Sequence, residues 1–390
     1  MNPRRVLWGS VLSPFALKIR AMFEHARLPL RSLPAEGGRV ENLRTDLAIQ
    51  IAKRRGTVVR YPDQSPLDEY PLVPFVVEDG RRVYYDSSCV GLWLDDTRGP
   101  SASPLLPEEP SARWVARLID EAFDEFGLYM LHHNRWVVSA RDNDAGPRLA
   151  AEFARVLPPG VRGIFAAGFS RRQVRRLPYL LSVAPEGFSM PGVSRVRTPP
   201  SRVGFPPTHA MLEEAWYAHL DATEAILATR PFLLGERFTI ADASAFGQLG
   251  GSFIDPSAHD RLREHAPRTH AWLDGIWRGA HVGSTGSVAL DGAVSPLLRI
   301  IGRTFVPLMQ QNARAHLAAS RAGETVFNEA AFDRSRALYD GELMGRPFRS
   351  VVKTFQVRTW RDLVAGFRGL TAAQRARIEA MLGQGVIDDA

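Results

Sequence analysis

The chain is poor in cysteine, in lysine and in long apolar runs. Its one cysteine, Cys89, cannot form an intrachain disulfide, and neither a cysteine-based zinc site nor an iron–sulfur site can be built. No run of about 18 apolar residues occurs, so no membrane span is expected. Lysine occurs only at Lys18, Lys53 and Lys353, and the other basic residues are arginines. These scarcities exclude disulfide scaffolds, cysteine metal centres and spanning helices.

The composition is that of a globular protein. With 390 residues, 45% of them hydrophobic and 23% charged, the chain can bury a sizeable core and should form more than one domain. The net charge of +7 comes from basic residues that are scattered and not interleaved with aromatic rings, which predicts no nucleic-acid partner. The apolar run after Arg5 is interrupted by Pro14 and Lys18, unlike a secretory signal, so we expect a cytoplasmic location.

The stretch from Arg4 to Arg20 predicts a strand followed by a helix. Val6–Trp8 is a short apolar run, and Ser13–Pro14 opens a segment with apolar residues at helical spacing. Ser13 is therefore expected at the helix N-cap, with proline at the first helical position. A hydroxyl there either caps the helix only or also stabilises an anion such as a thiolate, and the stretch alone leaves both interpretations open.

A second informative stretch runs from Val73 to Leu94. Phe75–Val77 and Arg82–Tyr85 predict two strands joined by an Asp79–Gly80 hairpin turn, and Asp86–Ser88 offers N-cap residues for the next helix. A strand is also predicted at 28–33 and a helix at 40–55, where the apolar positions are Leu43, Leu47, Ile51 and Ala52. The resulting order of strands and helices is thioredoxin-like. Val73–Pro74 stands where such folds place a cis-proline.

Beyond a proline-rich linker at 100–110 the pattern becomes helical. Helices are predicted over 114–136, 211–227, 262–277, 297–317, 349–367 and 371–382, with one or two helices and a long irregular insertion between 141 and 207. Thr239 and Asp242 form a capping-box pattern, which gives that acid a role in folding. The His132–His133 pair has no suitably spaced carboxylate, so we predict no metal site there.

These stretches together resemble the soluble glutathione transferase family. Trp8 with Ser13–Pro14–Phe15 resembles the tau-class and omega-class start, and Val73–Pro74–Phe75 with Asp86–Ser87 resembles the family's hairpin and following helix start. Phe232–Leu233, Gly235, Thr239 and Asp242 match the pattern of its helical domain. The replacement of glutamate or glutamine by Asp86, the long loop before Pro74 and the chain length are typical of divergent bacterial members.

The resemblance implies a fold class of α/β plus all-α. A thioredoxin-like glutathione-binding domain would span residues 1–99, and an all-helical C-terminal domain would span 108–278 with an insertion at about 140–207. Residues 279–390 would form a helical extension. Family members are usually dimers, so a homodimer is expected.

The resemblance also implies a chemistry. Ser13 would stabilise the glutathione thiolate, Val73 and Pro74 would pair with and shape the peptide edge, and Asp86 with Ser87 would hold the γ-glutamyl end. Phe15, Tyr129, His132, His133 and Trp136 are the candidates for the pocket of a small hydrophobic electrophile. Glutathione would be a cosubstrate and no metal is required, while Cys89 is expected to be a small buried residue.

Two functions remain open from the sequence. One is glutathione-dependent conjugation or reduction of a small electrophile. The other is a non-catalytic protein of the same fold, whose insertion and extension bind a protein partner.

Overall fold

The computed structural model describes residues 4–68, 70–98, 103–158, 160–190, 200–383 and 387. The start of the predicted linker, at Pro100, lies outside these ranges. Among the residues described, no helix combines the length and the apolar character needed to cross a membrane.

The N-terminal part is a four-stranded sheet between helices. Strands β1 (Arg5–Trp8), β2 (Arg31–Leu33), β3 (Phe75–Glu78) and β4 (Arg82–Tyr84) lie in the order β2-β1-β3-β4. β1 is parallel to β2 and antiparallel to β3, and β3 and β4 form the predicted hairpin. Asp79 and Gly80 both have positive φ, 51° and 66°, as a tight hairpin turn requires. This is the thioredoxin-like topology expected from the sequence.

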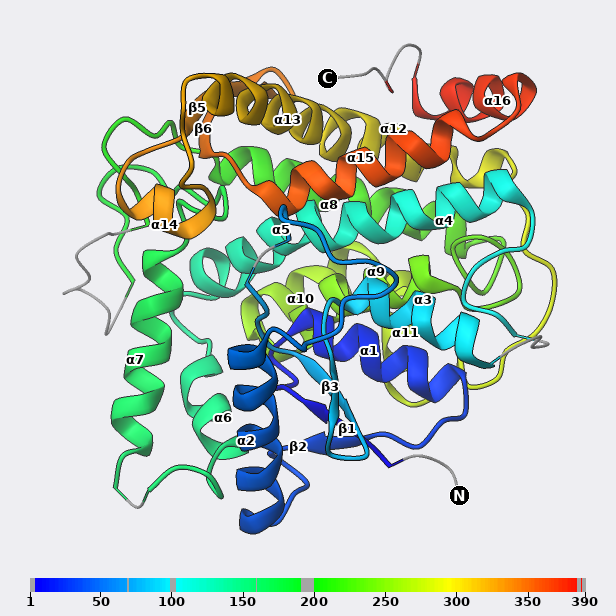
Figure 1. The fold of residues 1–390 in the computed structure, drawn as a ribbon. Coiled ribbons are helices and arrows are strands. Elements are labelled where there is room, and N and C mark those ends of the chain that lie inside the picture. Colours follow the sequence, from blue (N-terminus) through cyan, green and yellow to red (C-terminus); the bar gives the residue numbers. More distant parts are fainter. Residues whose placement is uncertain are drawn as a thin grey trace.

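Alternate residues of the strands serve two different cores. Leu7 and Val76 pack with helix α1 (Pro14–His25) and α3 (Ser87–Arg98), whereas Val6, Trp8 and Val77 pack with helix α2 (Arg39–Arg55) on the other side. Figure 1 shows α1 and α3 between the sheet and the remaining helices, with α2 at the front of the lower half. The sheet therefore has one side toward the helical part and one toward α2.

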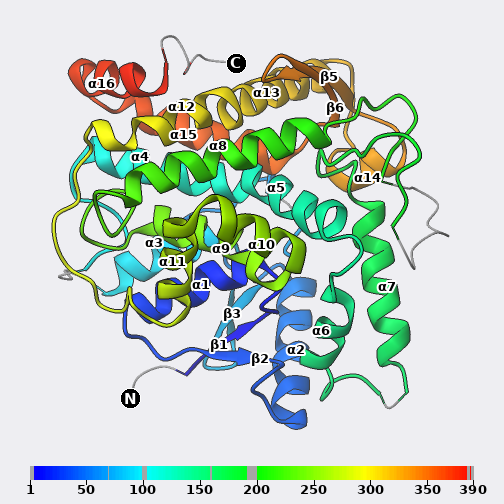
Figure 2. The same cartoon turned by 180° about the vertical axis from the view of Figure 1, so that it is seen from behind.

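The helical part begins with one nearly continuous helical run. It comprises α4 (Pro110–Ala122), the π-helix η1 (Phe123–Gly127), α5 (Leu128–His133) and the π-helix η2 (Asn134–Val138). The insertion supplies α6 (Ala145–Glu152) and α7 (Arg162–Arg175), which project beside α2 in Figures 1 and 2. The bundle continues with α8 (His209–Leu227), α9 (Ile240–Gly250), η3 (Gly251–Ile254), α10 (Pro256–His265) and α11 (Pro267–Trp277).

Helix α9 is the centre of the bundle, because every one of its residues is buried. Thr239 and Asp242 form the predicted capping box at its start, with Asp242 Oδ2 accepting from the Thr239 amide at 2.8 Å. Asp242 Oδ1 also accepts from the Leu233 amide at 2.8 Å. Burial raises the pKa of Asp242 to about 6 despite these bonds. Its role is structural, as the sequence indicated.

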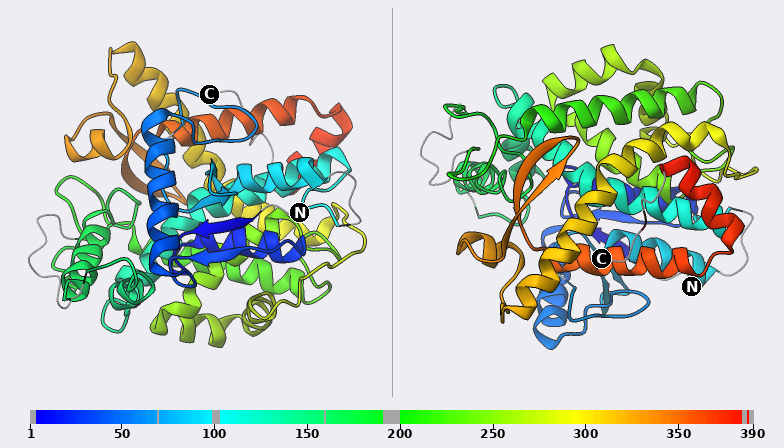
Figure 3. Two further views of the ribbon diagram at one scale, coloured as in Figure 1. Left: turned by 60° about the horizontal axis from the view of Figure 1, so that its bottom comes forward. Right: turned by 90° about the horizontal axis from the view of Figure 1, so that it is seen from above.

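The extension after Gly279 lies across the outer side of α4. It contains η4 (Gly292–Val294), α12 (Ser295–Arg303), α13 (Phe305–Arg321), α14 (Asn328–Asp333), β5 (Leu338–Leu343), β6 (Arg346–Val351), α15 (Thr354–Arg368) and α16 (Ala372–Leu382). α15 and α16 pack on α4 (Figure 3), and the Trp114 Nε1–H donates to the Leu363 carbonyl at 2.9 Å. The α16 capping box of Thr371 and Gln374 is confirmed.

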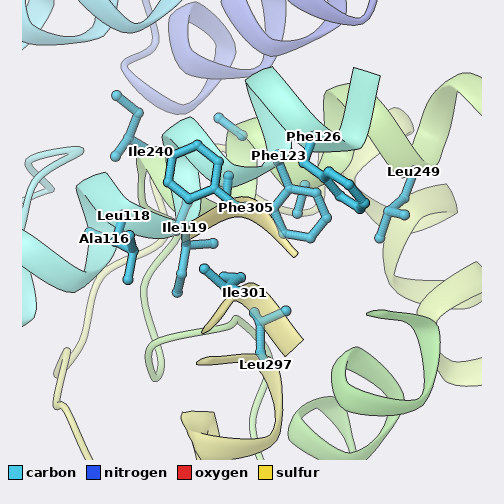
Figure 4. Packing of buried hydrophobic residues seen from close by; sticks show 14 of the residues in the cluster. Ala116, Leu118, Ile119, Phe123, Phe126, Ile240, Leu249, Leu297, Ile301 and Phe305 are labelled. Atoms are coloured by element: carbon cyan, nitrogen blue, oxygen red, sulfur yellow. The ribbon is translucent and has the colours of Figure 1, made fainter. Parts of the chain in front are cut away.

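One hydrophobic core joins the three parts of the chain. Side chains from α4, α9, α12 and α13 interdigitate around Ile119, Phe123, Ile301 and Phe305 (Figure 4). The same cluster extends from Leu7 in the sheet to residues of α15 and α16. The extension therefore completes the core of the helical part.

Several sequence predictions about elements are wrong in detail. The helix predicted over 349–367 begins with strand β6, so the extension is not wholly helical, and the helices predicted over 262–277 and 297–317 are each divided in two, at Pro267 and Thr304. The apolar spacing in α2 correctly predicted a helix, but Leu43, Leu47 and Ile51 are exposed. The buried side of this helix carries Asn42, Thr45, Ile49 and Ala52.

Candidate functional site

Three segments that are far apart in the sequence meet at one end of the strands, where β1 ends, β3 begins and β4 ends. They are the start of α1 at Ser13, the Val73–Pro74 bond before β3, and the start of α3 at Ser87. A Cβ added to Gly9 would lie 3.2 Å from Pro74 Cβ and 3.3 Å from Ala16 Cβ, so Pro74 and the first turn of α1 are neighbours. The N-termini of two helices thus lie near a cis-proline.

Ser13 is the N-cap of α1. Its backbone is extended (φ −86°, ψ 119°), its side chain accepts from the Ala16 amide at 3.4 Å, and proline follows at the first helical position. Since Oγ is the acceptor in this contact, the hydroxyl group can still donate a hydrogen bond to another partner. The geometry confirms Ser13 as the helix cap, and its stabilisation of a thiolate stays a prediction.

Val73–Pro74 is a cis peptide, as expected. Pro74 is buried, whereas 55% of Val73 is exposed. Val73 directly precedes β3, and its backbone is the one that an extended ligand would pair with.

Asp86 and Ser87 are both bound to other residues of the chain. Asp86 has φ 69°, and its carboxylate accepts from Arg60 Nε at 2.9 Å and from the Cys89 amide at 3.1 Å. Burial alone would raise the pKa of Asp86, but Arg60 outweighs it and the pKa lies below the ordinary range. The Ser87 hydroxyl donates to Asp124 Oδ2 at 3.2 Å, so this side chain points inward.

A buried charge cluster lies beneath the start of α3. Lys18 Nζ donates to Asp120 Oδ1 at 2.5 Å, Asp124 Oδ2 at 2.6 Å and Ser88 Oγ at 2.7 Å. Burial lowers the pKa of Lys18, but the two carboxylates outweigh it and raise the pKa above its ordinary value. The cluster ties α1, α3 and α4 together. Sequence reasoning missed it, although two aspartates four residues apart in an apolar helix were a signal.

The loop that leads to Ser13 is held by the helical part. Arg135 Nη1 donates to the Leu12 carbonyl at 2.8 Å while Arg135 Nε binds Asp255 at 2.9 Å. From the insertion, Glu152 accepts from the Val11 amide at 3.3 Å. Leu12 packs in a small core with Trp136, Val174, Leu177 and Met190. The insertion therefore abuts the segment that carries Ser13.

The five predicted electrophile-pocket residues do not lie together on one open surface. Phe15 and His132 are partly exposed. Tyr129 is buried beneath the extension, where Lys353 Nζ and Gln356 Nε2 donate to its hydroxyl at 2.5 and 2.8 Å. His133 is buried beside Ser182, and Trp136 belongs to the small core around Leu12. These last three rings contact protein on all sides.

No metal centre or reactive thiol is built into this region. Within the described ranges, no group of three or more His, Cys, Asp or Glu side chains is placed to hold a metal ion. Cys89 is buried, as expected, and burial raises the pKa of its thiol, which makes it unreactive.

One segment of the chain matches a known domain family. Residues 206–275, which include α8, α9 and the Thr239–Asp242 capping box, align with one domain family. It is the glutathione S-transferase C-terminal domain. The thioredoxin-like topology of the sheet and the match of residues 206–275 to this domain agree with the fold class expected from the sequence, a thioredoxin-like domain followed by a helical domain.

Solved glutathione transferases also align with the chain, at low identity. The beta-etherase LigF from a Sphingobium strain is 17% identical, with a TM-score of 0.39, covering 70% of this chain and 94% of its own. A glutathione S-transferase from Methylobacterium radiotolerans in complex with glutathione sulfonate is 19% identical, with a TM-score of 0.36, covering 74% and 98%. A tau-class enzyme from mango, Mangifera indica, is 14% identical, with a TM-score of 0.34, covering 71% and 90%. The comparison with curated proteins finds no match.

Proposed function

We propose that this chain is a glutathione transferase that binds glutathione at the edge formed by Ser13, Val73–Pro74 and the start of α3. The observation that carries the proposal is the meeting of the α1 N-cap with a cis-proline, since Pro74 packs against Gly9 next to the first turn of α1. The C-terminal domain match over 206–275 supports it from a separate part of the chain.

Ser13 has the role of a thiolate stabiliser in this proposal. Its hydroxyl donates to the glutathione sulfur while its oxygen keeps the Ala16 amide, and the positive end of the α1 dipole adds to the effect. A cysteine-like thiol titrates near about 8.5, so lowering its pKa by roughly one or two units makes most of it thiolate at neutral pH.

The γ-glutamyl end is assigned to the first turn of α3. The Ser87 hydroxyl is bound to Asp124, and the Asp86 carboxylate is bound to Arg60 and to the Cys89 amide. The ligand's carboxylate is therefore assigned to the Ser87 and Ser88 amides, which have no acceptor within the helix. Asp86, paired with Arg60, positions this turn and offers negative charge to the ligand's ammonium group.

The reaction is a displacement at a small hydrophobic electrophile. The thiol proton passes to solvent, a carbon–sulfur bond forms, and the leaving group departs with the electrons of its former bond. Phe15 and His132 remain the candidates for contact with the electrophile. A homodimer and a cytoplasmic location stay predictions from the family resemblance.

Retention on immobilised glutathione and turnover of an aryl halide test this function. Wild type should show both, and Ser13→Ala should keep binding while losing at least about tenfold in turnover. Thr371→Ala is the matched control, because it removes the N-cap of the remote helix α16 at a similar cost of about 1 kcal/mol. Unchanged turnover in Ser13→Ala removes Ser13 from the mechanism. Absence of both retention and turnover in wild type contradicts the proposal and favours the non-catalytic alternative.

A further inference from the structure

Helix α2 carries a row of exposed apolar side chains. Four apolar side chains, which we call the outer row, are exposed: Val40 by 62%, Leu43 by 51%, Leu47 by 59% and Ile51 by 40%. The spacing of three, four and four residues places them on one side of the helix. The opposite side, which packs on the sheet, includes two polar residues, Asn42 and Thr45.

The buried polar residue Asn42 has a structural role, whereas the outer row has none in the fold. Asn42 Nδ2 donates to the Pro34 carbonyl at 3.0 Å and so holds the turn after β2. No residue of the outer row belongs to a core cluster of the described residues, and all four are well exposed. An amphipathic surface helix normally turns its apolar side inward, so an apolar row facing outward indicates an external binding surface.

Arginines border the outer row. Arg39, Arg44, Arg54 and Arg55 are exposed, and none of the four forms an ion pair in the part of the chain that the structure describes. Of the two acidic residues of α2, Glu41 is already bound by Arg4 and Arg31, and Asp46 accepts a hydrogen bond from Gln50. The side chains around the outer row that form no ion pair therefore carry a net positive charge.

Further apolar side chains are exposed in the loop that follows α2. Lys53 Nζ lies 4.3 Å from the centre of the Tyr70 ring, and Tyr70 and Leu72 are 65% and 43% exposed. Exposed apolar side chains, basic side chains and an aromatic ring with a polar tip are together typical of protein surfaces that lie in the lipid–water interface.

We propose that the outer side of α2 binds the surface of an anionic lipid bilayer. The outer row would enter the boundary between headgroups and acyl chains, and the four arginines would contact anionic headgroups. A second copy of the chain fits this surface less well, because pairing two α2 helices brings four unpaired arginines against four others. This proposal does not depend on glutathione binding.

Co-sedimentation of the full-length chain with vesicles tests this surface. One set of vesicles is phosphatidylcholine alone, and the other contains phosphatidylglycerol as well. Wild type should partition onto the anionic vesicles at least about tenfold more strongly, and salt at about 0.5 M should remove most of that preference.

Two pairs of matched variants separate the apolar and the charged contributions. Leu43→Ser/Leu47→Ser should lose at least about tenfold in partitioning, whereas Val203→Ser/Leu317→Ser, which alters exposed residues outside α2, should bind like wild type. Arg44→Glu/Arg54→Glu should lose the preference for anionic vesicles, and Arg314→Glu/Arg321→Glu on α13 should keep it. Because all these side chains are exposed, the variants should fold, which circular dichroism checks.

Failure of wild type to sediment with anionic vesicles at low salt overturns the proposal. Equal sedimentation of the α2 variants and their controls also overturns it. A dimer seen by analytical ultracentrifugation that Leu43→Ser/Leu47→Ser dissociates, without any vesicle binding, assigns the surface to a second copy instead.

Discussion

Two of the three lysines are fully buried, and each joins parts of the chain that are distant in sequence. Lys18 joins α1 to Asp120 and Asp124 of the helical part, and Lys353 joins the extension to Tyr129. A buried ammonium group is expensive to desolvate and persists only with close partners. These two side chains therefore fix the relative positions of their elements.

Replacement of Lys18 by methionine should be strongly destabilising. It leaves Asp120 and Asp124 buried next to an uncharged side chain, and breaking a buried ion pair in this way costs about 3–5 kcal/mol. Chemical denaturation measures the loss in free energy of unfolding.

Lys53→Met is the control for that experiment. Lys53 is only partly buried and its ammonium group lies over the Tyr70 ring, so its replacement should cost about 1 kcal/mol or less. Equal losses in the two variants would show that the buried cluster adds no specific stability.

At this scale the sequence predicts local features better than tertiary ones. Ser13 at a helix N-cap and the cis bond at Pro74 follow from Ser-Pro and Val-Pro in a strand–helix pattern, and both are confirmed. The Lys18 cluster was missed because Asp120 and Asp124 lie more than a hundred residues from Lys18, and their spacing alone does not reveal their partner. The inward orientation of the Ser87 side chain also depends on a residue distant in sequence, because its hydroxyl donates to Asp124.

Among the elements, α1 and α9 make the contact that joins the two main parts. A Cβ added to Gly247 in α9 would lie 2.4 Å from the Pro14 carbonyl oxygen and 3.3 Å from Lys18 Cβ. Only glycine permits α9 to approach the start of α1 so closely. Gly247 thus positions the helix that Ser13 caps.

Gly247→Ala should push α9 away from α1 and destabilise the protein by about 1–3 kcal/mol, the usual cost of overpacking. Gly168→Ala in α7 is the matched control, since a Cβ there meets nothing within 4 Å. That change should be neutral or stabilising by up to about 1 kcal/mol because alanine favours helix. Thermal unfolding compares the two, and a stable Gly247→Ala would contradict the close contact.

The sequence indicates whether a segment forms a helix or a strand more reliably than it indicates which side of that element is buried. The spacing of Leu43, Leu47 and Ile51 correctly indicated a helix, but it did not reveal that these side chains are exposed, because periodicity does not say which side a partner covers. The β5–β6 hairpin was missed because Phe348 and Val351 fit helical spacing as well as a strand. The Met344–Gly345 turn, with φ of 52° and 72°, marks it in the structure.

For the whole molecule, the extension is connected to the candidate site through alternating charges. Arg358 of α15 binds Asp68 at 3.1 Å, Asp68 lies 3.5 Å from Arg60, and Arg60 binds Asp86 at 2.9 Å. The loop before Pro74 is thereby fixed between the sheet domain and the extension. The division into domains at 99, 108 and 278 stays a prediction, although all three parts share one core.

The central claim is that Ser13 lowers the pKa of a bound glutathione thiol. Titration of the thiolate's ultraviolet absorbance, with glutathione bound to wild type and to Ser13→Ala, measures that pKa directly. We expect the bound thiol in wild type to ionise roughly one to two units below its ordinary value of about 8.5, and the variant to return it toward that value. An unshifted thiol in wild type, or the same shift in both proteins, would contradict the account.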